Sequence, residues 1–265
     1  MATVAARNLL ITYGRSTIVP DLSISLEEGL ITAIIGPNGS GKSTVLRTLA
    51  RLQRPAAGVV LLDGRDVATM ATKDVARRLA ILPQVPEVPA GVTVWDLVGF
   101  GRYPFQGLLG TRSVDDIAAM EWALEVTDLT AYRDRAVDTL SGGERQRAWI
   151  AMALAQRTGV LLLDEPTTFL DIRYQIEILS LVRRLNREQG ITVGWVLHDL
   201  NQAAAYSDRL VLLHDGQIVT QGTPNDVMTA DTIRAVFGID VTVMLDPDSG
   251  CPTCLLYARQ RSVSV

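Results

Sequence analysis

A run of glycines followed by a lysine and a serine is the segment of this sequence with the clearest chemistry. Residues 36–43 read Gly-Pro-Asn-Gly-Ser-Gly-Lys-Ser, which is the full pattern of a phosphate-binding loop. Gly39 and Gly41 allow backbone N–H groups to turn towards a phosphate, and the start of a following helix adds partial positive charge. Lys42 would reach the β- and γ-phosphates of a nucleotide, and the hydroxyl of Ser43 would ligate Mg²⁺. A glycine-rich turn that binds nothing is the alternative. The residues predicted to contact nucleotide in this segment are Gly36, Pro37, Asn38, Gly39, Ser40, Gly41, Lys42, Ser43 and Thr44.

Two carboxylates follow an apolar run later in the chain. Residues 160–163 read Val-Leu-Leu-Leu, and Asp164 and Glu165 come directly after them. Because an unpaired buried charge is costly, we expect both carboxylates at the carboxyl end of a core strand, where open α/β sheets bind ligands. Asp164 would hold Mg²⁺ directly or through water, and Glu165 would orient and polarise an attacking water. The alternative is an exposed strand end with two unrelated acids.

A third segment combines a serine, two glycines and a glutamate at a predicted helix start. Residues 140–146 read Leu-Ser-Gly-Gly-Glu-Arg-Gln. A plain capping box, with Ser141 capping the helix and Glu144 reaching back, is the simplest interpretation. Gly142 and Gly143 would weaken the first turn by ~1 kcal/mol each relative to alanine, so they suggest that something comes very close to the backbone. A helix start with a free hydroxyl and N–H groups would be a second anion site.

The elements that must position these segments begin with short strands. A hairpin turn is predicted at Asp63-Gly64, and a helix over residues 41–52 directly after the glycine-rich loop. The predicted strands of this part are residues 8–13, 22–26, 30–35 and 59–62.

The middle of the chain, residues 86–157, is predicted to be mainly helical. Ser113 to Asp116 resembles a capping box, and apolar residues then recur at helical spacing. A second helix is predicted to begin near Ser141. We therefore expect an α/β fold into which a helical subdomain is inserted.

From Gly159 onward, strands and helices alternate again. The tail after Phe237 adds a strand, a turn at residues 246–250 and another strand. The predicted strands are residues 160–163 and 191–197, of the buried parallel type, and a hairpin formed by residues 211–213 and 218–219.

Composition excludes several classes of protein. The 265 residues carry a net charge of −4, with 48% apolar and 20% charged residues, so a disordered chain is excluded and a nucleic-acid partner is not expected. The longest stretch without charged residues, Gly29 to Gly41, is too short for a membrane span of roughly 20 residues. Neither a signal peptide at the amino terminus nor a disulfide framework is predicted, since only Cys251 and Cys254 are present.

With these segments in view, the sequence resembles the ATP-binding cassette (ABC) family of ATPases over nearly its whole length. The segment from Ser141 to Glu144 is similar to the family signature, with glutamate in place of the more frequent glutamine. In that family the signature of one subunit closes over the nucleotide held by another. The resemblance therefore implies that Ser141, Gly142, Gly143 and Glu144 contact ATP in trans. The fold it implies is a P-loop NTPase core with an amino-terminal antiparallel β-subdomain and an inserted α-helical subdomain.

The other motifs of the family follow in order. Tyr13 matches the aromatic residue that stacks on adenine, and Gln84 matches the glutamine that links Mg²⁺ and water to the transport partner. Asp171 matches the D-loop aspartate that contacts nucleotide in trans, although Thr168-Phe169 replaces the more common Ser-Ala. His198 matches the switch histidine at the γ-phosphate. The implied catalytic set is Glu165, His198 and Gln84, and the implied Mg²⁺ ligands are Ser43, Gln84 and Asp164.

A narrower resemblance points to the ATPase subunits of ferric-siderophore importers, with haem and cobalamin importers as the alternative. It rests on three segments: residues 101–107 (Gly-Arg-Tyr-Pro-Phe-Gln-Gly), 166–172 and 198–203 (His-Asp-Leu-Asn-Gln-Ala). The resemblance implies a homodimer that drives two membrane permease subunits and works with a periplasmic or lipoprotein substrate-binding protein. It would be peripheral to the cytoplasmic face of the inner membrane. The implied domain limits are 4–239 for the ATPase, including the insertion at about 86–157, and 240–265 for a carboxyl-terminal extension.

Other readings are less well supported. A soluble ABC ATPase of DNA repair or translation would usually have paired cassettes or coiled-coil insertions, and neither is present. A switch that binds ATP without hydrolysing it would be expected to lack Glu165 or His198. Cys251 and Cys254 are expected to be free thiols on a surface turn, with a redox-sensitive pair as the alternative.

Overall fold

The amino-terminal part of the chain forms an antiparallel sheet. The computed structural model describes residues 3–84, 90–107 and 111–255, and in this part the sheet has the strand order β2-β1-β4-β5. Strands β1 and β2 are longer than predicted, because they continue to pair through register shifts. The hairpin turn at Asp63-Gly64 is confirmed, since Leu62 pairs with Arg65 across it. The strands are β1 (Val4–Tyr13), β2 (Ser16–Leu26), β4 (Ala57–Leu62) and β5 (Arg65–Asp66).

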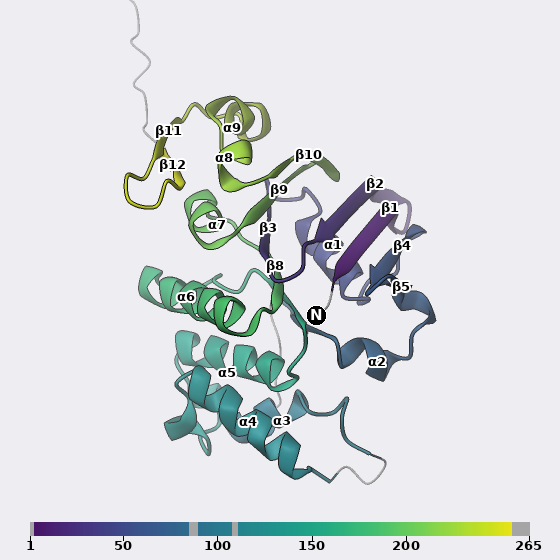
Figure 1. Cartoon of the computed structure of the whole chain (residues 1–265), viewed down its shortest axis with the longest axis vertical. Coiled ribbons are helices and arrows are strands. Elements are labelled where there is room, and N and C mark those ends of the chain that lie inside the picture. Colours follow the sequence, from purple (N-terminus) through teal and green to yellow (C-terminus); the bar gives the residue numbers. More distant parts are fainter. Residues whose placement is uncertain (1–2, 85–89, 108–110, 256–265) are drawn as a thin grey trace, which may run out of the picture.

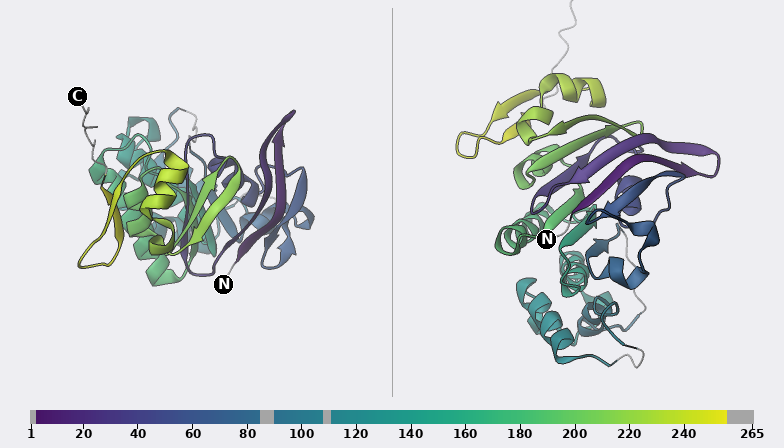
Figure 2. Two further views of the ribbon diagram at one scale, coloured as in Figure 1. Left: turned by 90° about the horizontal axis from the view of Figure 1, so that it is seen from above. Right: turned by 45° about the vertical axis from the view of Figure 1, so that its right-hand side comes forward.

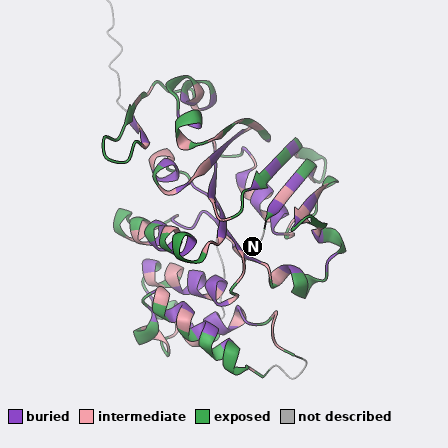
Figure 3. Cartoon of the chain, in the orientation of Figure 1, coloured by how far each residue is buried: buried purple, intermediate pink, exposed green. Residues whose placement is uncertain are grey.

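A second, mostly parallel sheet lies at the centre of the molecule (Figure 1). Its strand order is β10-β9-β3-β8-β7-β6, and only the β9–β10 pair is antiparallel. Strands β3, β7 and β8 are buried along their whole length (Figure 3), as expected of short apolar runs that are covered on both faces. The strands are β3 (Ile31–Ile35), β6 (Leu79–Leu82), β7 (Val160–Asp164), β8 (Thr192–Val196), β9 (Arg209–His214) and β10 (Gln217–Gly222).

Helices surround this sheet, and α3, α4 and α5 also pack on one another at one end of the molecule. Helix α1 follows the glycine-rich loop as predicted, but it ends at Leu49 rather than residue 52, and Arg51 takes a left-handed conformation with φ of 61°. The capping boxes predicted at Ser113 and Ser141 are both confirmed. The helices close to the sheet are α1 (Lys42–Leu49), α5 (Gly142–Ala155), α6 (Ile172–Gln189) and α7 (Leu200–Tyr206). Helices α3 (Val94–Phe100) and α4 (Val114–Val126) pack against α5 and form the helical group with it.

The remaining elements are short connections. The helical insertion was predicted to start at residue 86, which lies outside the described residues. These connections are the helices α2 (Thr72–Ala76), α8 (Pro224–Val227) and α9 (Ala230–Phe237) and the 3₁₀ helices η1 (Val67–Thr69), η2 (Thr130–Tyr132) and η3 (Val137–Thr139).

The parallel sheet separates two hydrophobic cores. Ala33, Leu163 and Trp195 pack into one core with residues of α5 and α6, whereas Ile34 and Leu162 pack into the other with α1 and the antiparallel sheet. Successive side chains of a strand point to opposite faces, so each of the parallel strands contributes to both cores. Figure 2 shows the resulting layers, with the purple and blue antiparallel sheet across the central sheet from the green helix α6.

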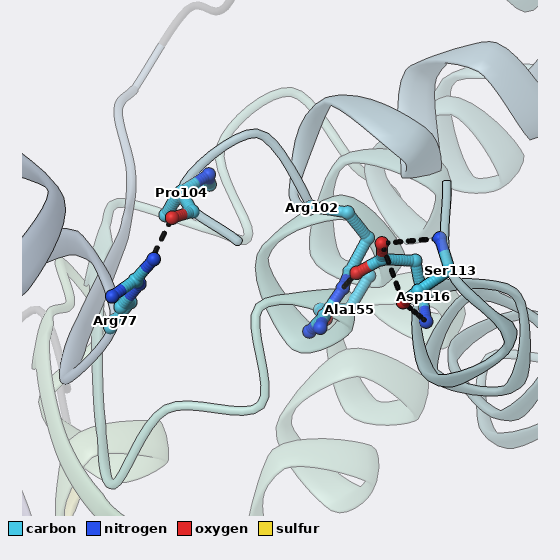
Figure 4. Close-up of polar contacts among 6 residues, drawn as sticks. All are labelled: Arg77, Arg102, Pro104, Ser113, Asp116 and Ala155. Atoms are coloured by element: carbon cyan, nitrogen blue, oxygen red, sulfur yellow. Dashed lines mark hydrogen bonds and ion pairs between the residues drawn. The ribbon is translucent and has the colours of Figure 1, made fainter. Parts of the chain in front are cut away.

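A buried ion pair holds the helical group together (Figure 4). Arg102, just after α3, places its Nε 2.8 Å from Oδ1 of Asp116 in α4, and it donates to the carbonyl oxygen of Ala155 at 2.7 Å. Both side chains are less than a tenth exposed. Burial alone would raise the pKa of Asp116, but hydrogen bonds from Ser113 and Arg102 outweigh it and lower the pKa. Figure 4 also shows Arg77, after α2, donating to the carbonyl of Pro104 at 3.0 Å.

The carboxyl-terminal hairpin consists of β11 (Thr242–Leu245) and β12 (Pro252–Leu255), as the predicted strand–turn–strand required. The expectation of two thiols on a surface turn is wrong for Cys254, which lies in β12 and is only 4% exposed because this strand packs against α7. Cys251 is half-buried, and both thiols are free. Burial raises the pKa of each thiol, which makes both less reactive.

None of the helices that the structure describes is both long enough and apolar enough to cross a lipid bilayer.

Candidate nucleotide-binding site

The glycine-rich loop leaves the carboxyl end of β3 and runs into α1. Gly41 caps this helix with a positive φ of 94°, a conformation that suits glycine. At Gly36, where φ is 146°, a Cβ would collide with the backbone carbonyl of Leu213 in β9, so only glycine fits there. The loop opens onto a pocket of about 520 Å³. The residues that line this pocket are Tyr13, Ile18, Asn38, Gly39, Gly41, Lys42, Ser43, Thr44, Gln84, Glu165 and His198.

Most of the predicted nucleotide-contacting residues therefore converge on one pocket from five separate segments. Gly36, Pro37 and Ser40 of the loop do not line it, and Ser40 is buried. Tyr13, at the end of β1, is 47% exposed at the edge of the pocket, where a planar base could stack on its ring. Ile18 of β2 was not predicted, because nothing in its sequence neighbourhood distinguishes it from an ordinary strand residue.

The Lys42 side chain turns back over the loop. Its Nζ donates to the carbonyl oxygens of Gly36 and Pro37 at 2.9 and 2.8 Å. Burial lowers the pKa of Lys42, and the charges of Glu165 and Asp164 oppose this lowering without cancelling it. The ammonium group is thus held close to both the loop and the two carboxylates, where a phosphate would meet it.

Glu165 is the centre of a polar cluster at the end of β7. His198 Nε2 lies 2.7 Å from Oε1 of Glu165, and Thr168 donates to Oε2 at 3.1 Å. Gln84 donates to the same Oε2. Glu165 has a positive φ of 53°, which is uncommon outside glycine and turns the chain sharply after the strand. The carboxylate is therefore held from three sides and is only 9% exposed.

Asp164 is paired with a residue that the sequence did not reveal. Arg47 of α1 places Nε and Nη2 each 3.1 Å from Oδ2 of Asp164. The pair joins residues far apart in the chain, so no local pattern could have predicted it. Oδ1 of Asp164 is buried and has no hydrogen-bond partner.

The donor set fits a magnesium ion. A free carboxylate oxygen on Asp164, the hydroxyl of Ser43 and the amide oxygen of Gln84 are oxygen ligands of the kind Mg²⁺ prefers. In the described part of the chain no group of three His, Cys, Asp or Glu side chains lies close enough together to hold a metal ion. A magnesium site here would thus use a single carboxylate, with phosphate oxygens completing the shell.

The segment from Ser141 to Glu144 forms the start of α5 and does not line the pocket. The capping box uses Ser141 Oγ as an acceptor for the Glu144 N–H at 3.3 Å, and Glu144 Oε2 accepts from the Ser141 N–H at 2.8 Å. Hydrogen bonds from the backbone N–H and from the side chain of Ser141 lower the pKa of Glu144. Asp171, which caps α6 and accepts from the N–H of Tyr174, does not line the pocket either.

The close approach that the two glycines suggested is made by a neighbouring aromatic ring. A Cβ on Gly143 would lie 2.5 Å from Cδ1 of Tyr174, whereas a Cβ on Gly142 would lie 3.8 Å from Cδ2 of Leu170, an ordinary contact. Packing within the chain therefore requires glycine at position 143 but not at position 142.

We expect Gly143→Ala to lower the free energy of unfolding by about 1–3 kcal/mol, since overpacking forces a rigid ring to move. Gly142→Ala is the matched control. It should leave stability unchanged or raise it slightly, because alanine favours a helix over glycine. Urea unfolding of the two variants tests this, and equal stabilities would contradict the role of the Tyr174 ring.

The chain is similar to known proteins over most of its length. A family model described as "ABC transporter" matches residues 19–168. The iron(3+)-hydroxamate import ATP-binding protein FhuC of Bacillus subtilis is 49% identical, with 97% of this chain and 96% of that protein covered. The ferric enterobactin transport ATP-binding protein FepC of Escherichia coli is 48% identical, with 98% and 96% covered. Among solved structures, a dimeric post-hydrolysis state of the ATP-binding cassette MJ0796, bound to ADP and Pi, matches with a TM-score of 0.72 and 28% identity, over 83% of this chain and 98% of that one.

Proposed function

The chain belongs to the ABC transporter family, and from this premise we propose that it binds and hydrolyses ATP to drive the import of an iron–siderophore complex. The observation that carries the ATPase part is the pocket itself, which Lys42 of the glycine-rich loop and Glu165 line together and where their charges interact. The cargo part is supported by the near full-length similarity to proteins named for ferric hydroxamate and ferric enterobactin.

The residues of the pocket have distinct roles in this proposal. Backbone N–H groups of the loop and the Lys42 ammonium hold the β- and γ-phosphates, and Tyr13 stacks on the adenine. Asn38, Gly39, Gly41, Ser43 and Thr44 complete the loop contacts. Ser43, Asp164 and Gln84 would hold Mg²⁺, which when bound neutralises charge on the phosphate oxygens.

Hydrolysis requires a water to attack the γ-phosphorus. The water oxygen forms a bond to phosphorus, the bond to the bridging oxygen breaks, and the water proton passes to the carboxylate of Glu165. His198, 2.7 Å from Glu165, keeps the carboxylate oriented and donates to charge that develops on the γ-phosphate. Gln84 donates a hydrogen bond to the same carboxylate, so its position depends on whether nucleotide and Mg²⁺ are bound.

We further propose that two copies of the chain bind two ATP molecules head to tail. In this arrangement Ser141, Gly142, Gly143 and Glu144, with Asp171, contact the nucleotide held by the partner copy. These residues lie outside the chain's own pocket, and the similar cassette MJ0796 is dimeric with ADP and Pi. The partial positive charge at the start of α5 suits a phosphate group.

The transport partners belong to the same proposal. Two membrane permease subunits would contact the dimer on the cytoplasmic side of the membrane, and closure of the dimer would change the side from which their transport path is accessible. A periplasmic or lipoprotein substrate-binding protein would deliver the cargo to them. The chain would thus be peripheral to the inner membrane. Residues 4–239 form the proposed ATPase domain, with residues of about 86–157 as its helical insertion and 240–265 as a short extension.

Replacing Lys42 by alanine tests ATP binding. A charge-assisted hydrogen bond contributes about 1.5–3 kcal/mol, so we expect the affinity for ATP to fall by about 10–150-fold. Titration with a fluorescent ATP analogue measures it, with Lys73→Ala, an exposed lysine of α2, as the matched control. An unchanged affinity for Lys42→Ala would contradict the proposed site.

Uptake by cells tests the cargo. Cells whose only copy carries Lys42→Ala should accumulate less radiolabelled ferric hydroxamate or ferric enterobactin than cells with the unaltered chain. Cobalamin and haem uptake are measured in parallel. If Lys42→Ala lowered the uptake of cobalamin or haem but not that of the ferric siderophores, the siderophore assignment would be wrong, while the ATPase assignment would stand.

A further inference from the structure

Helix α7 starts two residues after His198, and its first turn carries two amide side chains from the 198–203 segment. Gln202 is buried, only 8% exposed. Its Nε2 donates to Oε1 of Gln175 in α6 at 2.7 Å. A buried amide held by another amide fixes the orientation of both side chains, because an unpaired polar group there would be costly.

The contact continues from Gln175 to the segment before α6. Gln175 Nε2 donates to the backbone carbonyl of Leu170 at 2.9 Å. Leu170 directly precedes Asp171, the cap of α6. Two hydrogen bonds in series therefore join the helix that follows His198 to the backbone beside Asp171.

The same segment also contacts the start of α5. The Leu170 side chain lies beside Gly142, and the ring of Tyr174 packs against Gly143. A shift of Leu170 relative to α6 would therefore change the packing at Gly142. The chain of contacts from Gln202 through Gln175 to Leu170 therefore reaches Gly142, at the N-terminus of α5.

We propose that Gln202 and Gln175 are positioning residues that couple the chain's own nucleotide pocket to the surface offered to a second copy. Because α7 follows His198, a movement of His198 at the γ-phosphate shifts Gln202, and the two hydrogen bonds carry this shift to Leu170 and Asp171. This inference rests on the proposed head-to-tail dimer, and it adds to that dimer a route by which one site reports its occupancy to the other.

The test separates ATP binding by one chain from ATP-dependent pairing of two. The full-length chain carrying Glu165→Gln, which should retain ATP, is the parent, and its dimerisation is followed by analytical ultracentrifugation with and without MgATP. Into this parent we place Gln202→Met or Gln175→Met, each of similar length but without the amide. We expect the ATP affinity of the dilute monomer to stay unchanged, while the ATP-dependent dimer weakens about 5-fold or more, the lower range of coupling between sites.

Two further variants refine the test. Gln175→Glu still accepts from Gln202 but cannot donate to Leu170, so it should weaken the dimer as Gln175→Met does. The double variant Gln202→Met/Gln175→Met should be no weaker than either single variant, because both act in one series.

Asn201→Ala is the matched control on the neighbouring position. Asn201 donates to the Cys254 carbonyl at 3.1 Å and accepts from the Cys254 N–H at 2.7 Å, so this variant frees the carboxyl-terminal hairpin and breaks two hydrogen bonds without touching the Gln202–Gln175 contact. It should leave ATP-dependent dimerisation unchanged.

Each outcome decides something. Equal weakening by Asn201→Ala and Gln202→Met would show general loosening of α7 and overturn the inference, as would unchanged dimerisation in the Gln202 and Gln175 variants. If the parent itself formed no ATP-dependent dimer, the head-to-tail arrangement under the proposed function would be wrong, and the inference would fall with it.

Discussion

Glutamine in place of Glu165 is expected to slow ATP hydrolysis by about 10²–10⁴-fold, the usual contribution of a general base. The amide cannot accept the proton of the attacking water. It keeps the shape of the side chain, and its single oxygen can still accept hydrogen bonds from Thr168 and Gln84, while its NH2 group replaces the oxygen that lies beside His198. Nucleotide affinity should therefore change little, so that kcat falls while ATP binding persists.

The matched control is Glu188→Gln, which makes the same chemical change on an exposed residue of α6. Steady-state phosphate release measures the rates, and equilibrium titration measures the ATP affinity. Hydrolysis at the parent rate by Glu165→Gln would contradict the role of Glu165 as the base. A large loss of ATP affinity would instead indicate that its charge mainly holds the site together.

Asp116→Ala is expected to lower the free energy of unfolding by about 3–5 kcal/mol, which is typical when one partner of a buried ion pair is removed. The substitution leaves the Arg102 guanidinium uncompensated at a site where its side chain is only 7% exposed (Figure 4). It also removes the Asp116 half of the capping box with Ser113. Thermal unfolding should show a midpoint lower by roughly 6–20 °C for a chain of this size.

Asp115→Ala, one residue earlier on the exposed side of α4, is the control and should change stability by less than about 0.5 kcal/mol. The double substitution Arg102→Met/Asp116→Leu should recover much of the loss, because an apolar pair of similar size can replace a buried ion pair. A small effect of Asp116→Ala would contradict the stabilising role of the pair. No recovery in the double variant would show that the loss does not come from the uncompensated charge of Arg102.

The pH dependence gives a second readout of the same pair. The pKa of Asp116 is lowered in the folded chain, so its stabilising contribution is present above the ordinary pKa of aspartate and is lost as the pH falls through the lowered value. The difference in stability between the unaltered chain and Asp116→Ala should therefore shrink in acid.

Local features of the sequence predicted the fold well. The strand before the glycine-rich loop, both capping boxes and the carboxyl-terminal hairpin depend on residues close together in the chain, and each lies where it was predicted. The boundaries were less accurate. Helix α1 stops at Leu49 because Arg51 turns the chain into a left-handed conformation, for which the apolar pattern gives no signal.

The arrangement of the candidate site was only partly predictable. Lys42 and Glu165 were chosen by residue type and position and His198 by the family resemblance, and the structure places all three in one pocket. The pairing of Arg47 with Asp164 and the Tyr174 ring against Gly143 join elements distant in sequence, so they depend on tertiary packing. The burial of Cys254 was missed for the same reason, since it results from contact with α7.

The strand order of the central sheet has a consequence for synthesis on the ribosome. Strand β3, which ends at the glycine-rich loop, lies between β8 and β9, so neither of its neighbours exists until residues 192–214 have been translated. At a synthesis rate of about 5–20 residues per second, both edges of β3 stay unpaired for roughly 10–30 s. During that interval the apolar strand lacks its partners and is open to aggregation or to binding by chaperones, and the loop cannot acquire its final shape before the carboxyl-terminal third emerges.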